Sequence, residues 1–452
     1  MRSPVTKYLS PLSARVAFGR VLCAVIALAV AIFVIPGSAP AQVEDSLSIN
    51  RVIREALKNN DRLAAAKYMA ESAERRAQSA GTWDDPMLMF GVQNLPGNFD
   101  FKMDPMTMKM VGISQNIPYA GQKGLERKAA RSQAQASVEQ TRETEADLVV
   151  AARQAYFDLY YRRLNLRVLE AQREIVNQIV AATTARLRSN QAGQDEVLSS
   201  QAELWRLESS ILSQQQQIEA VEMELNSLRG VDPATKVPGL IAPPFDLVPD
   251  SVAVWIDLAE QNYPALKRLN RQAEGYQFSA EASRRMRWPM LGVSAAYGIR
   301  SGSSMDMDGV SKQWDNMYSF QANISLPLFS RHAQTNMARS MEAMQRSSLA
   351  EANQLWRDAQ ADLQSLHARV LRLQKSLELY RERVVPASED AYQSAMAGYM
   401  SNRLPFTSLL NYAITVNRDK ITANDIAGEL GRTLAEVYRY TAAPIDTGSA
   451  VH

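Results

Sequence analysis

The residues of this sequence with the most distinctive chemistry are methionines, which gather in two stretches. Six lie within 24 residues, at Met87, Met89, Met103, Met106, Met108 and Met110. Three more follow at Met305, Met307 and Met317. Thioether sulfur is a soft ligand that favours copper(I) and silver(I), so both stretches are candidates for binding such ions. Methionine is also a common filler of irregular space, and the spacing alone leaves both interpretations open.

Other residue types that carry out catalysis or bind metals are not grouped. The three histidines, His332, His367 and His452, are scattered and form no ligand set. The sequence contains neither a nucleophile–base motif nor a phosphate-binding loop. An enzyme is therefore the function class least favoured by these residues, and we predict no cofactor and no catalytic or structural metal centre.

The composition narrows the function further. The chain has 452 residues, 46% of them apolar, and a formal net charge of +2. Four basic residues stand near its start, at Arg2, Lys7, Arg15 and Arg20, and without them the net charge is −2. A nearly neutral protein has no electrostatic basis for binding nucleic acid, so we predict no nucleic-acid partner.

The N-terminal segment has the pattern of a secretory signal peptide. Basic residues are followed by an apolar run from Val21 to Ile35, and Ala39-Pro40-Ala41 fits a small-x-small cleavage site. The run of 15 residues is short for a membrane-spanning helix, although a membrane anchor is the alternative. The single cysteine, Cys23, stands at the start of this run, where no lipoprotein acylation is expected. We predict a signal peptide over residues 1–41.

The rest of the chain contains one pattern twice. When the sequence is shifted by 203 residues, Asn59 meets Asn262, and Pro86-Met87-Leu88 meets Pro289-Met290-Leu291. Fixed offsets of this kind indicate an internal structural repeat. We predict a first repeat over residues 42–232, a Pro-rich connector over 233–250, a second repeat over 251–441 and a tail over 442–452.

After the matched proline, each copy changes from helical to strand periodicity. Helical patterns cover residues 47–80 and 265–287, and apolar residues then alternate with small or polar ones. The alternating segments are residues 88–92, 111–117, 291–299 and 318–326. Strands of about ten residues can cross a bilayer at a tilt. Four strands cannot close a lipid-spanning barrel, so a membrane barrel would need several chains. The alternative is a sheet packed on a soluble core.

Long helices follow each pair of strands. No proline occurs between Pro118 and Pro233 and no glycine from Glu126 to Ala192, and a helix over this glycine-free stretch would be roughly 100 Å long. The corresponding stretch in the second copy, residues 328–385, is somewhat shorter and has coiled-coil spacing. The chain is expected to reverse near Asn190–Gly193 and Gly398–Asn402, where Asn and Gly tolerate a left-handed backbone. Returning helices are predicted over residues 195–228 and 406–440.

This organisation resembles the outer-membrane factors, the TolC family, over nearly all of residues 47–441. The segments that carry the resemblance are Leu47-Ser48-Ile49, Asn262-Tyr263-Pro264-Ala265-Leu266, Ile117-Pro118-Tyr119, Gly121-Gln122-Lys123, Gly398-Tyr399 and Leu409-Leu410. The resemblance implies a mainly α fold with a contribution to a membrane β-barrel. It also implies a homotrimer with a twelve-stranded barrel among outer-membrane lipids and an α-barrel that extends into the periplasm.

The same resemblance implies a passive exit duct without catalytic residues or a cofactor. Its partners would be a periplasmic adaptor protein and an inner-membrane pump, of the RND type. The sequence around the methionines also resembles the heavy-metal branch of the family, the CusC and CzcC type. Drug efflux and type I protein secretion use the same scaffold and remain alternatives. A periplasmic coiled-coil scaffold is an alternative of another class, but it would leave the four strands unexplained.

The resemblance also assigns residues to a periplasmic gate. The tyrosine of the closed tip is matched by Tyr399, and its acidic hydrogen-bonding partner by Glu196. Two aspartates that narrow the pore in TolC fall at Ser408 and Asn411, so an acidic ring would need other residues. Asp195, Glu389 and Asp390 are the substitutes that we considered. The alternative is an ordinary surface acid and a packed tyrosine.

The two reversals are the parts of the chain expected to contact the adaptor. The residues concerned are Asn190, Gly193, Gly398 and Asn402.

Overall fold

The computed structural model describes residues 46–305 and 307–442. The chain divides into a unit Met1–Ser46 and a unit Leu47–His452. The predicted signal peptide, with Cys23, and residues 443–452 of the predicted tail lie outside the described residues.

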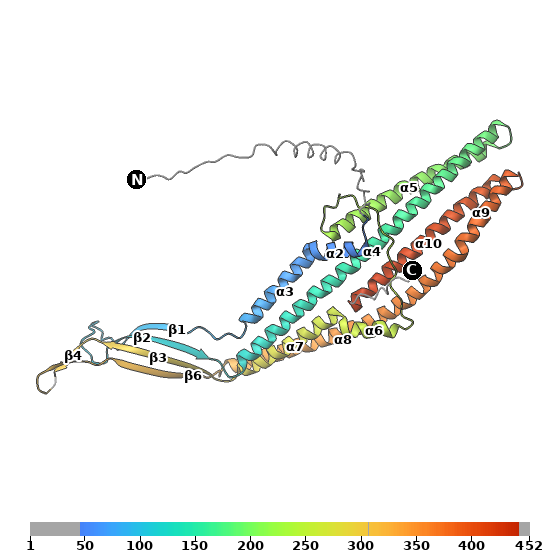
Figure 1. Cartoon of the computed structure of the whole chain (residues 1–452). Coiled ribbons are helices and arrows are strands. Elements are labelled where there is room, and N and C mark those ends of the chain that lie inside the picture. Colours follow the sequence, from blue (N-terminus) through green and yellow to red (C-terminus); the bar gives the residue numbers. More distant parts are fainter. Residues whose placement is uncertain (1–45, 306, 443–452) are drawn as a thin grey trace, which may run out of the picture. The chain divides into compact units, whose positions relative to one another are not determined.

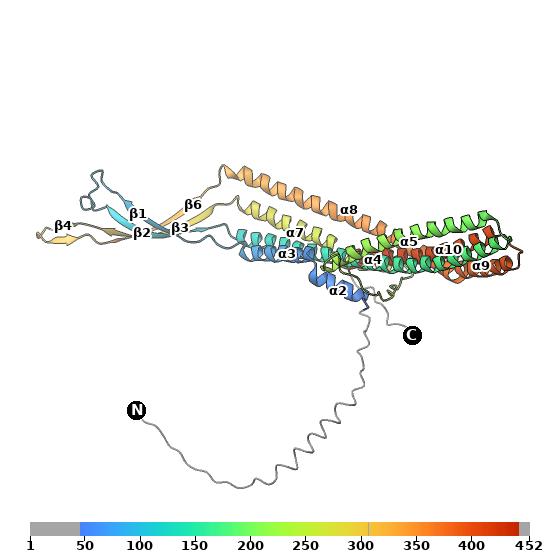
Figure 2. The same cartoon turned by 90° about the horizontal axis from the view of Figure 1, so that it is seen from above.

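The same order of elements occurs twice in the second unit. The first copy consists of α2 (Ile49–Asn59), α3 (Asp61–Ser79), β1 (Met87–Gln93), β2 (Met108–Ile117), α4 (Gln122–Arg188) and α5 (Gln194–Arg229). The second consists of α6 (Val252–Asn262), α7 (Pro264–Arg285), β3 (Met290–Arg300), β6 (Met317–Ser325), α8 (Ser330–Leu379), the π-helical turn η1 (Tyr380–Val384), α9 (Val385–Met400) and α10 (Phe406–Thr441). In Figures 1 and 2 the strands lie at one end of this unit and the two helix reversals at the other.

The helix predicted over residues 47–80 is in fact two helices. Asn60 is extended, with φ −76° and ψ 120°, and its side chain accepts hydrogen bonds from the backbone N–H groups of Arg62 and Leu63. It therefore caps α3, a role in which Asn competes well with helix continuation. The second copy breaks at the matching place, because Pro264 disfavours a helical conformation for Tyr263.

The four long strands form one antiparallel sheet in the order β1–β2–β3–β6. Its register places Leu88 opposite Ile113, Ile113 opposite Ala295, and Ala295 opposite Phe320. All four predicted strands are confirmed, although β1 has only 7 residues. The second loop also contains a small hairpin that the sequence pattern did not predict, formed by β4 (Ser303–Met305) and β5 (Ser311–Gln313).

Helix α4 is the central helix of the helical part and packs against α3, α5, α7 and α10. Its 67 residues span roughly 100 Å, as the absence of proline predicted. Its middle third contributes to the main core, in which Tyr156, Phe157 and Leu159 are fully buried together with Trp255 of α6. Gly431 of α10 faces Phe157 so closely that a Cβ atom would overlap the ring, which lets α10 approach α4.

The second long helical stretch is not shorter than the first, contrary to the sequence-based expectation. It runs from Ser330 through η1 and α9 to Met400 and so continues past residue 385. Pro386 is the second residue of α9, just after η1, and lacks the N–H group that an α-helix needs. A single π turn is a known way to insert such an irregularity without ending a helix.

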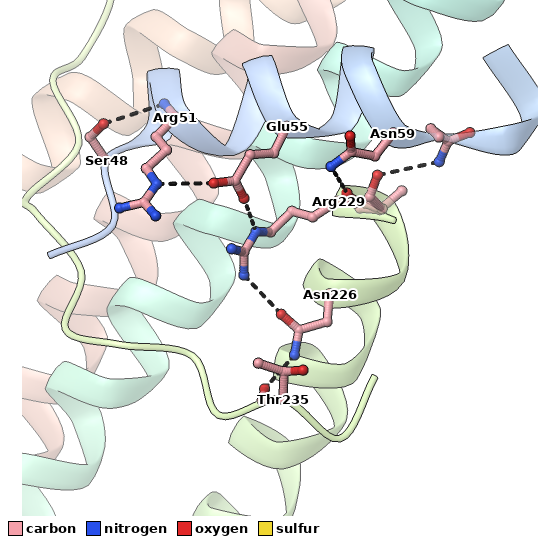
Figure 3. Close-up of polar contacts among 9 residues, drawn as sticks. Ser48, Arg51, Glu55, Asn59, Asn226, Arg229 and Thr235 are labelled. Atoms are coloured by element: carbon pink, nitrogen blue, oxygen red, sulfur yellow. Dashed lines mark hydrogen bonds and ion pairs between the residues drawn. The ribbon is translucent and has the colours of Figure 1, made fainter. Parts of the chain in front are cut away.

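A polar network fixes the end of α5 against α2 (Figure 3). Arg229 donates to Glu55 over 2.6 Å and to Asn226 over 2.9 Å, while Arg51 donates to the other oxygen of Glu55. Burial acts to raise the pKa of Glu55, but the hydrogen bonds and charges of Arg229 and Arg51 outweigh it and lower that pKa. Gly230 then ends the helix with φ 68°.

Candidate functional site

The two helix reversals have the same backbone design. In the first, the N–H of Gln191 donates to Arg186 O over 2.8 Å, and Asn190 is left-handed with φ 61°. In the second, the N–H of Arg403 donates to Gly398 O over 2.8 Å, and Asn402 has φ 60°. This is the hydrogen-bond pattern with which left-handed residues end helices. The predicted positions of both reversals are confirmed.

The four residues predicted at these tips have different local roles. Asn190 and Asn402 supply the left-handed turns. Gly193 is the N-cap of α5, with φ −79°, and Gly398 lies within α9. Of the two residue types expected to tolerate a left-handed backbone at the reversals, Asn occupies both positions, because its side chain can bond locally.

Tyr399 is packed between the two hairpins. It is 8% exposed and joins a small core with Ile179 of α4 and with Phe406 and Leu409 of α10. Its ring lies 6.1 Å from that of Phe406. Within the described chain, the Tyr399 hydroxyl is buried without a hydrogen-bond partner. A buried hydroxyl without a partner is costly, so this conformation leaves a polar group of the tip unsatisfied.

Glu196 has a matching property in the first hairpin. Its Oε2 atom is also buried, and no hydrogen-bond partner for it occurs among the described residues. Glu196 is the third residue of α5, and Ser408 is the third residue of α10, so the two occupy equivalent places. Ser408 is half-buried and donates its backbone N–H to Pro405 O, while Asn411 is exposed. The two hairpins thus differ in charge at the same position.

Arg186 is the residue that joins the two tips, and the sequence reasoning missed it. Its guanidinium lies 4.7 Å from the centre of the Tyr399 ring, a cation–π distance. It also donates to the side chain of Asn402 over 2.8 Å and to Gln191 O over 3.2 Å. Arg186 and Gly398 each accept the hydrogen bond that closes their turn. A comparison of the two turns would therefore have singled out this arginine.

The acids considered as substitutes for the missing aspartates are not alike. Glu389 forms an ion pair with Lys420 over 2.6 Å. Asp195 and Asp390 are exposed, and Asp195 lies in the first turn of α5. Because Lys420 balances the charge of Glu389, the unpaired negative charge near the tips is at Glu196, Asp195 and Asp390.

At the other end of the unit, the sheet has two chemically different faces. One face carries large apolar side chains that are well exposed, including Phe90 at 76%, Phe320 at 81% and Leu88 at 64%. The opposite face of the described strands carries glycine, alanine, serine, asparagine, glutamine, one arginine and methionine. Exposed apolar surface of this extent marks an interaction site on a folded protein.

Aromatic residues gather where the sheet meets the helices. Trp83 and Trp288 are 60% and 53% exposed, and Phe329 is 97% exposed. Trp288 stacks on Tyr119, with 5.4 Å between ring centres, and Arg285 lies over the Tyr119 ring. Exposed tryptophan and tyrosine favour the interface between a membrane and water.

The methionines predicted as candidate ligands separate into two groups. Those in the four-stranded sheet all share its small polar face, as the register shows: Met87, Met89, Met108, Met110, Met290 and Met317. Met103, Met106, Met305 and Met307 lie in the loops beyond the strands, and each is at least 49% exposed. Met290 was not among the residues singled out from the sequence.

Residues 46–305 and 307–442 contain no group of three His, Cys, Asp or Glu side chains that could hold a metal ion. A groove of about 710 Å³ between α3 and α4 is lined by charged, amide and aliphatic side chains, among them Glu74, Arg127 and Arg131. Its lining offers no hydroxyl, thiol or imidazole group for nucleophilic catalysis. In the described part of the chain, no helix combines the length and apolar character needed to span a membrane.

Comparisons with known proteins agree with this architecture. Residues 255–439 match the family described as outer membrane efflux protein. The structure is similar to the outer-membrane channel OprN, with 16% identity, 88% of this chain and 90% of that chain covered, and a TM-score of 0.72. It is similar to CusC, with 17% identity, 87% and 91% covered, and a TM-score of 0.72.

A third similar structure is the outer membrane protein VceC from Vibrio cholerae, with 16% identity, 87% and 96% covered, and a TM-score of 0.71. No curated protein sequence matches the chain. The resemblance to the outer-membrane factors is confirmed by the family match and by the shared fold.

Proposed function

We propose that this chain, which has an outer membrane efflux protein match over residues 255–439 and a TolC-like fold, is one protomer of a trimeric outer-membrane channel. The observation that carries this proposal is the sheet. One of its faces exposes Phe90, Phe320 and Leu88, and its other face is small and polar. That division is the one expected between lipid and an aqueous lumen.

The edges of the sheet support an assembly of several copies. Strands β1 and β6 are the two edges of the four-stranded sheet, and open edges are not tolerated in lipid. Three copies joined from β6 to β1 would close a barrel of twelve strands without any open edge. The exposed tryptophans Trp83 and Trp288 would then mark the periplasmic side of the membrane.

The helices would continue the duct into the periplasm for roughly 100 Å. We propose that the tips at Asn190, Gly193, Gly398 and Asn402 dock onto a periplasmic adaptor, which couples the duct to an inner-membrane pump of the RND type. The two repeats of this duct would comprise residues 42–232 and 251–441, joined by the connector 233–250. The duct itself would carry out no catalysis.

We further propose that the tips form the gate, through Glu196 and Tyr399 together with Ser408 and Asn411. Tyr399 Oη and Glu196 Oε2 are both buried with no hydrogen-bond partner among the described residues. If the tips rearrange on closing and expose these atoms, groups of neighbouring copies in a closed trimer could satisfy them. The combined variant Tyr399→Phe and Glu196→Ala should then raise the single-channel conductance. An unchanged conductance would remove both residues from the gate.

The membrane proposal can be tested with two substitutions in neighbouring residues. Phe320→Lys places a charge on the apolar face, where it costs about 2–4 kcal/mol at the middle of a bilayer. Gln321→Lys places the same charge on the opposite face. We expect Phe320→Lys to be lost from the carbonate-resistant outer-membrane fraction and Gln321→Lys to be retained with channel activity. If wild-type protein is washed off by carbonate, the proposal is wrong.

We also propose a cargo for this channel. The methionines on the lumenal face favour soft heavy-metal ions over other cargo. We expect deletion of the protein to lower tolerance to copper or silver, with cobalt and zinc tested alongside. Unchanged tolerance to all four ions would favour the drug-efflux or protein-secretion alternatives.

A further inference from the structure

The part of the sheet farthest from the helices contains a group of thioethers around one glycine. Gly298 of β3 is paired with Met110 of β2 on one side and with Met317 of β6 on the other. Met108 lies on the same face of β2, and its Sδ atom occupies the space that a side chain at residue 298 would fill. Met110 and Met317 thus flank Gly298 from the two neighbouring strands, and Met108 fills the space above it.

The spacing allows the three sulfur atoms to reach a common point. Adjacent strands are about 4.8 Å apart, so the Cα atoms of Met110 and Met317 are separated by about 10 Å across Gly298. Met108 and Met110, two residues apart on one strand, are separated by about 7 Å. Long, flexible methionine side chains can cover such distances over a glycine. Gly298 is thus what makes room for a shared site.

Burial separates this group from ordinary exposed methionines. Met108 is only 4% exposed, Met110 is half-buried, and Met317 is 36% exposed. The site is therefore closed on the side of Met108 and open on the side of Met317. An ion could enter from the lumen without any movement of the strands.

We propose that Met108, Met110 and Met317 form a binding site for copper(I) or silver(I) at the exit of the duct. This inference rests on the proposed channel function, which makes this face lumenal. Each protomer would supply a complete site, because the three strands belong to one chain.

The surroundings of the site select the kind of ion. The small polar face of the described strands carries no carboxylate, imidazole or thiolate group. Ions such as zinc and cobalt prefer those ligands, whereas neutral thioethers suit soft monovalent ions. The one charged group on this face, Arg300, donates to Asp315 O and Pro105 O in the loops, which holds its guanidinium at the loops.

The position suits transit rather than storage. The exposed thioethers of Met103, Met106, Met305 and Met307 lie in the loops that follow the same strand ends. Conduction requires sites that bind well enough for entry and weakly enough for release. A neutral three-thioether site followed by further thioethers meets that requirement for ions leaving the cell.

The experiment measures ion binding and channel activity on the same purified full-length protein. Copper(I) is titrated under reducing conditions against a chromogenic chelator, and silver(I) is titrated as the nitrate by calorimetry. The triple variant Met108→Leu, Met110→Leu and Met317→Leu conserves side-chain volume. The control is Met87→Leu with Met290→Leu, on the same face but at the helix end of the sheet.

We expect the triple variant to bind copper(I) and silver(I) at least about tenfold more weakly, a loss typical of disturbed metal sites, and the control to bind like wild type. Gly298→Ala, whose Cβ would displace Met108 Sδ, should weaken binding in the same direction. Equal binding by the triple variant, equal loss in the control, or no binding by wild type would each overturn the site.

Conductance in potassium nitrate separates this inference from the channel proposal. Wild-type protein that conducts but does not bind either ion would overturn the metal site and leave the channel intact. Protein that neither conducts nor inserts into membranes would overturn the channel, and the lumenal site with it.

Discussion

The two returning helices, α5 and α10, show how one backbone design can be fixed in two ways. Both have 36 residues, and both leave a turn closed by a left-handed asparagine. Helix α10 packs tightly on α4 through Gly431, which faces Phe157. Helix α5 instead leaves Trp205 and Leu212 more than 60% exposed. The two turns give both hairpins the same backbone shape, whereas the side chains determine how closely each returning helix packs on its neighbours.

The C-terminal ends of α5 and α10 are also held by different interactions. The end of α5 is held by Arg229, its ion pair with Glu55 and the left-handed Gly230. The end of α10 is held by the buried Tyr440, whose hydroxyl donates to Asp362 over 2.8 Å. Burial raises the pKa of Tyr440, and the neighbouring Asp362 raises it further. The end of the first hairpin thus depends on an ion pair that acid can break, whereas the end of the second combines the buried Tyr440 with a more exposed ion pair between Arg439 and Asp147.

The largest effect is expected where α10 meets α4. Gly431→Leu forces a side chain into the ring of Phe157, and overpacking of this kind costs about 3 kcal/mol. The matched control is Glu219→Leu, since Glu219 and Gly431 occupy the same place in their helices and Glu219 is exposed. We expect thermal unfolding in detergent, followed by circular dichroism, to shift strongly only for Gly431→Leu. Equal shifts would show that α5 and α10 are held alike.

The next effect concerns the ion pair at the end of α5. Arg229→Ala leaves Glu55 without its main partner, and we expect a loss of about 2 kcal/mol, less than for a fully buried pair because Glu55 is 25% exposed. The control is Thr441→Val, at the same place in α10, where the hydroxyl donates only to Val437 O. Denaturant unfolding measures the free energy of unfolding of both variants. If Arg229→Ala loses no more of it than Thr441→Val, the ion pair does not hold the end of α5.

The pH dependence of that loss follows from the lowered pKa of Glu55. Its ordinary value is 4.5, and its value in the folded protein is lower. The stability that the ionised carboxylate contributes is therefore present above pH 4.5 and is lost as pH falls through the folded value. The difference in unfolding free energy between wild type and Arg229→Ala should therefore become smaller as the pH falls below 4.5. A difference in unfolding free energy that stays constant from pH 7 to below the folded pKa of Glu55 would exclude the ion pair as its cause.

The sequence alone predicted most of the helices and strands, because the patterns that indicate them are local. The shared Pro-Met-Leu tripeptide, the alternating strands and the proline-free stretch each correspond to one element. The break at Asn60, the continuation of the helix past Pro386 and the β4–β5 hairpin were missed. Each of these depends on a single cap or turn that competes with a strong periodic pattern.

The tips show the same limit. The turns could be located from Asn190 and Asn402, whose preference for left-handed backbone is intrinsic. The contact between Arg186 and Tyr399 could not, because it joins two hairpins that are far apart in the sequence. Likewise, the alternation placed methionines in strands, but only the register brought Met110 and Met317 to the two sides of Gly298.

A smaller effect is expected from the residue that joins the two hairpins. Arg186→Ala removes the cation–π contact with Tyr399 and the hydrogen bond to Asn402, together about 1 kcal/mol at a partly exposed site. If the tips form the gate, the open fraction should rise about fivefold, since 1.4 kcal/mol corresponds to a factor of ten. The control is Arg188→Ala, in the same last turn but exposed. Single-channel recordings that show equal opening for both variants would contradict the role of Arg186.

The smallest change in stability is expected at the residue that follows each returning helix. Gly230 after α5 and Ala442 after α10 both have a left-handed backbone, with φ 68° and 45°. The left-handed conformation strains alanine by roughly 1 kcal/mol, and Ala442→Gly removes that strain. Part of the gain is offset because glycine also increases the freedom of the unfolded chain, so we expect a net stabilisation of about 0.5 kcal/mol. Ala442→Ser, which keeps a Cβ atom, should give no gain in the same unfolding measurement. A gain for serine equal to that for glycine would mean that backbone strain at residue 442 does not distinguish the end of α10 from that of α5.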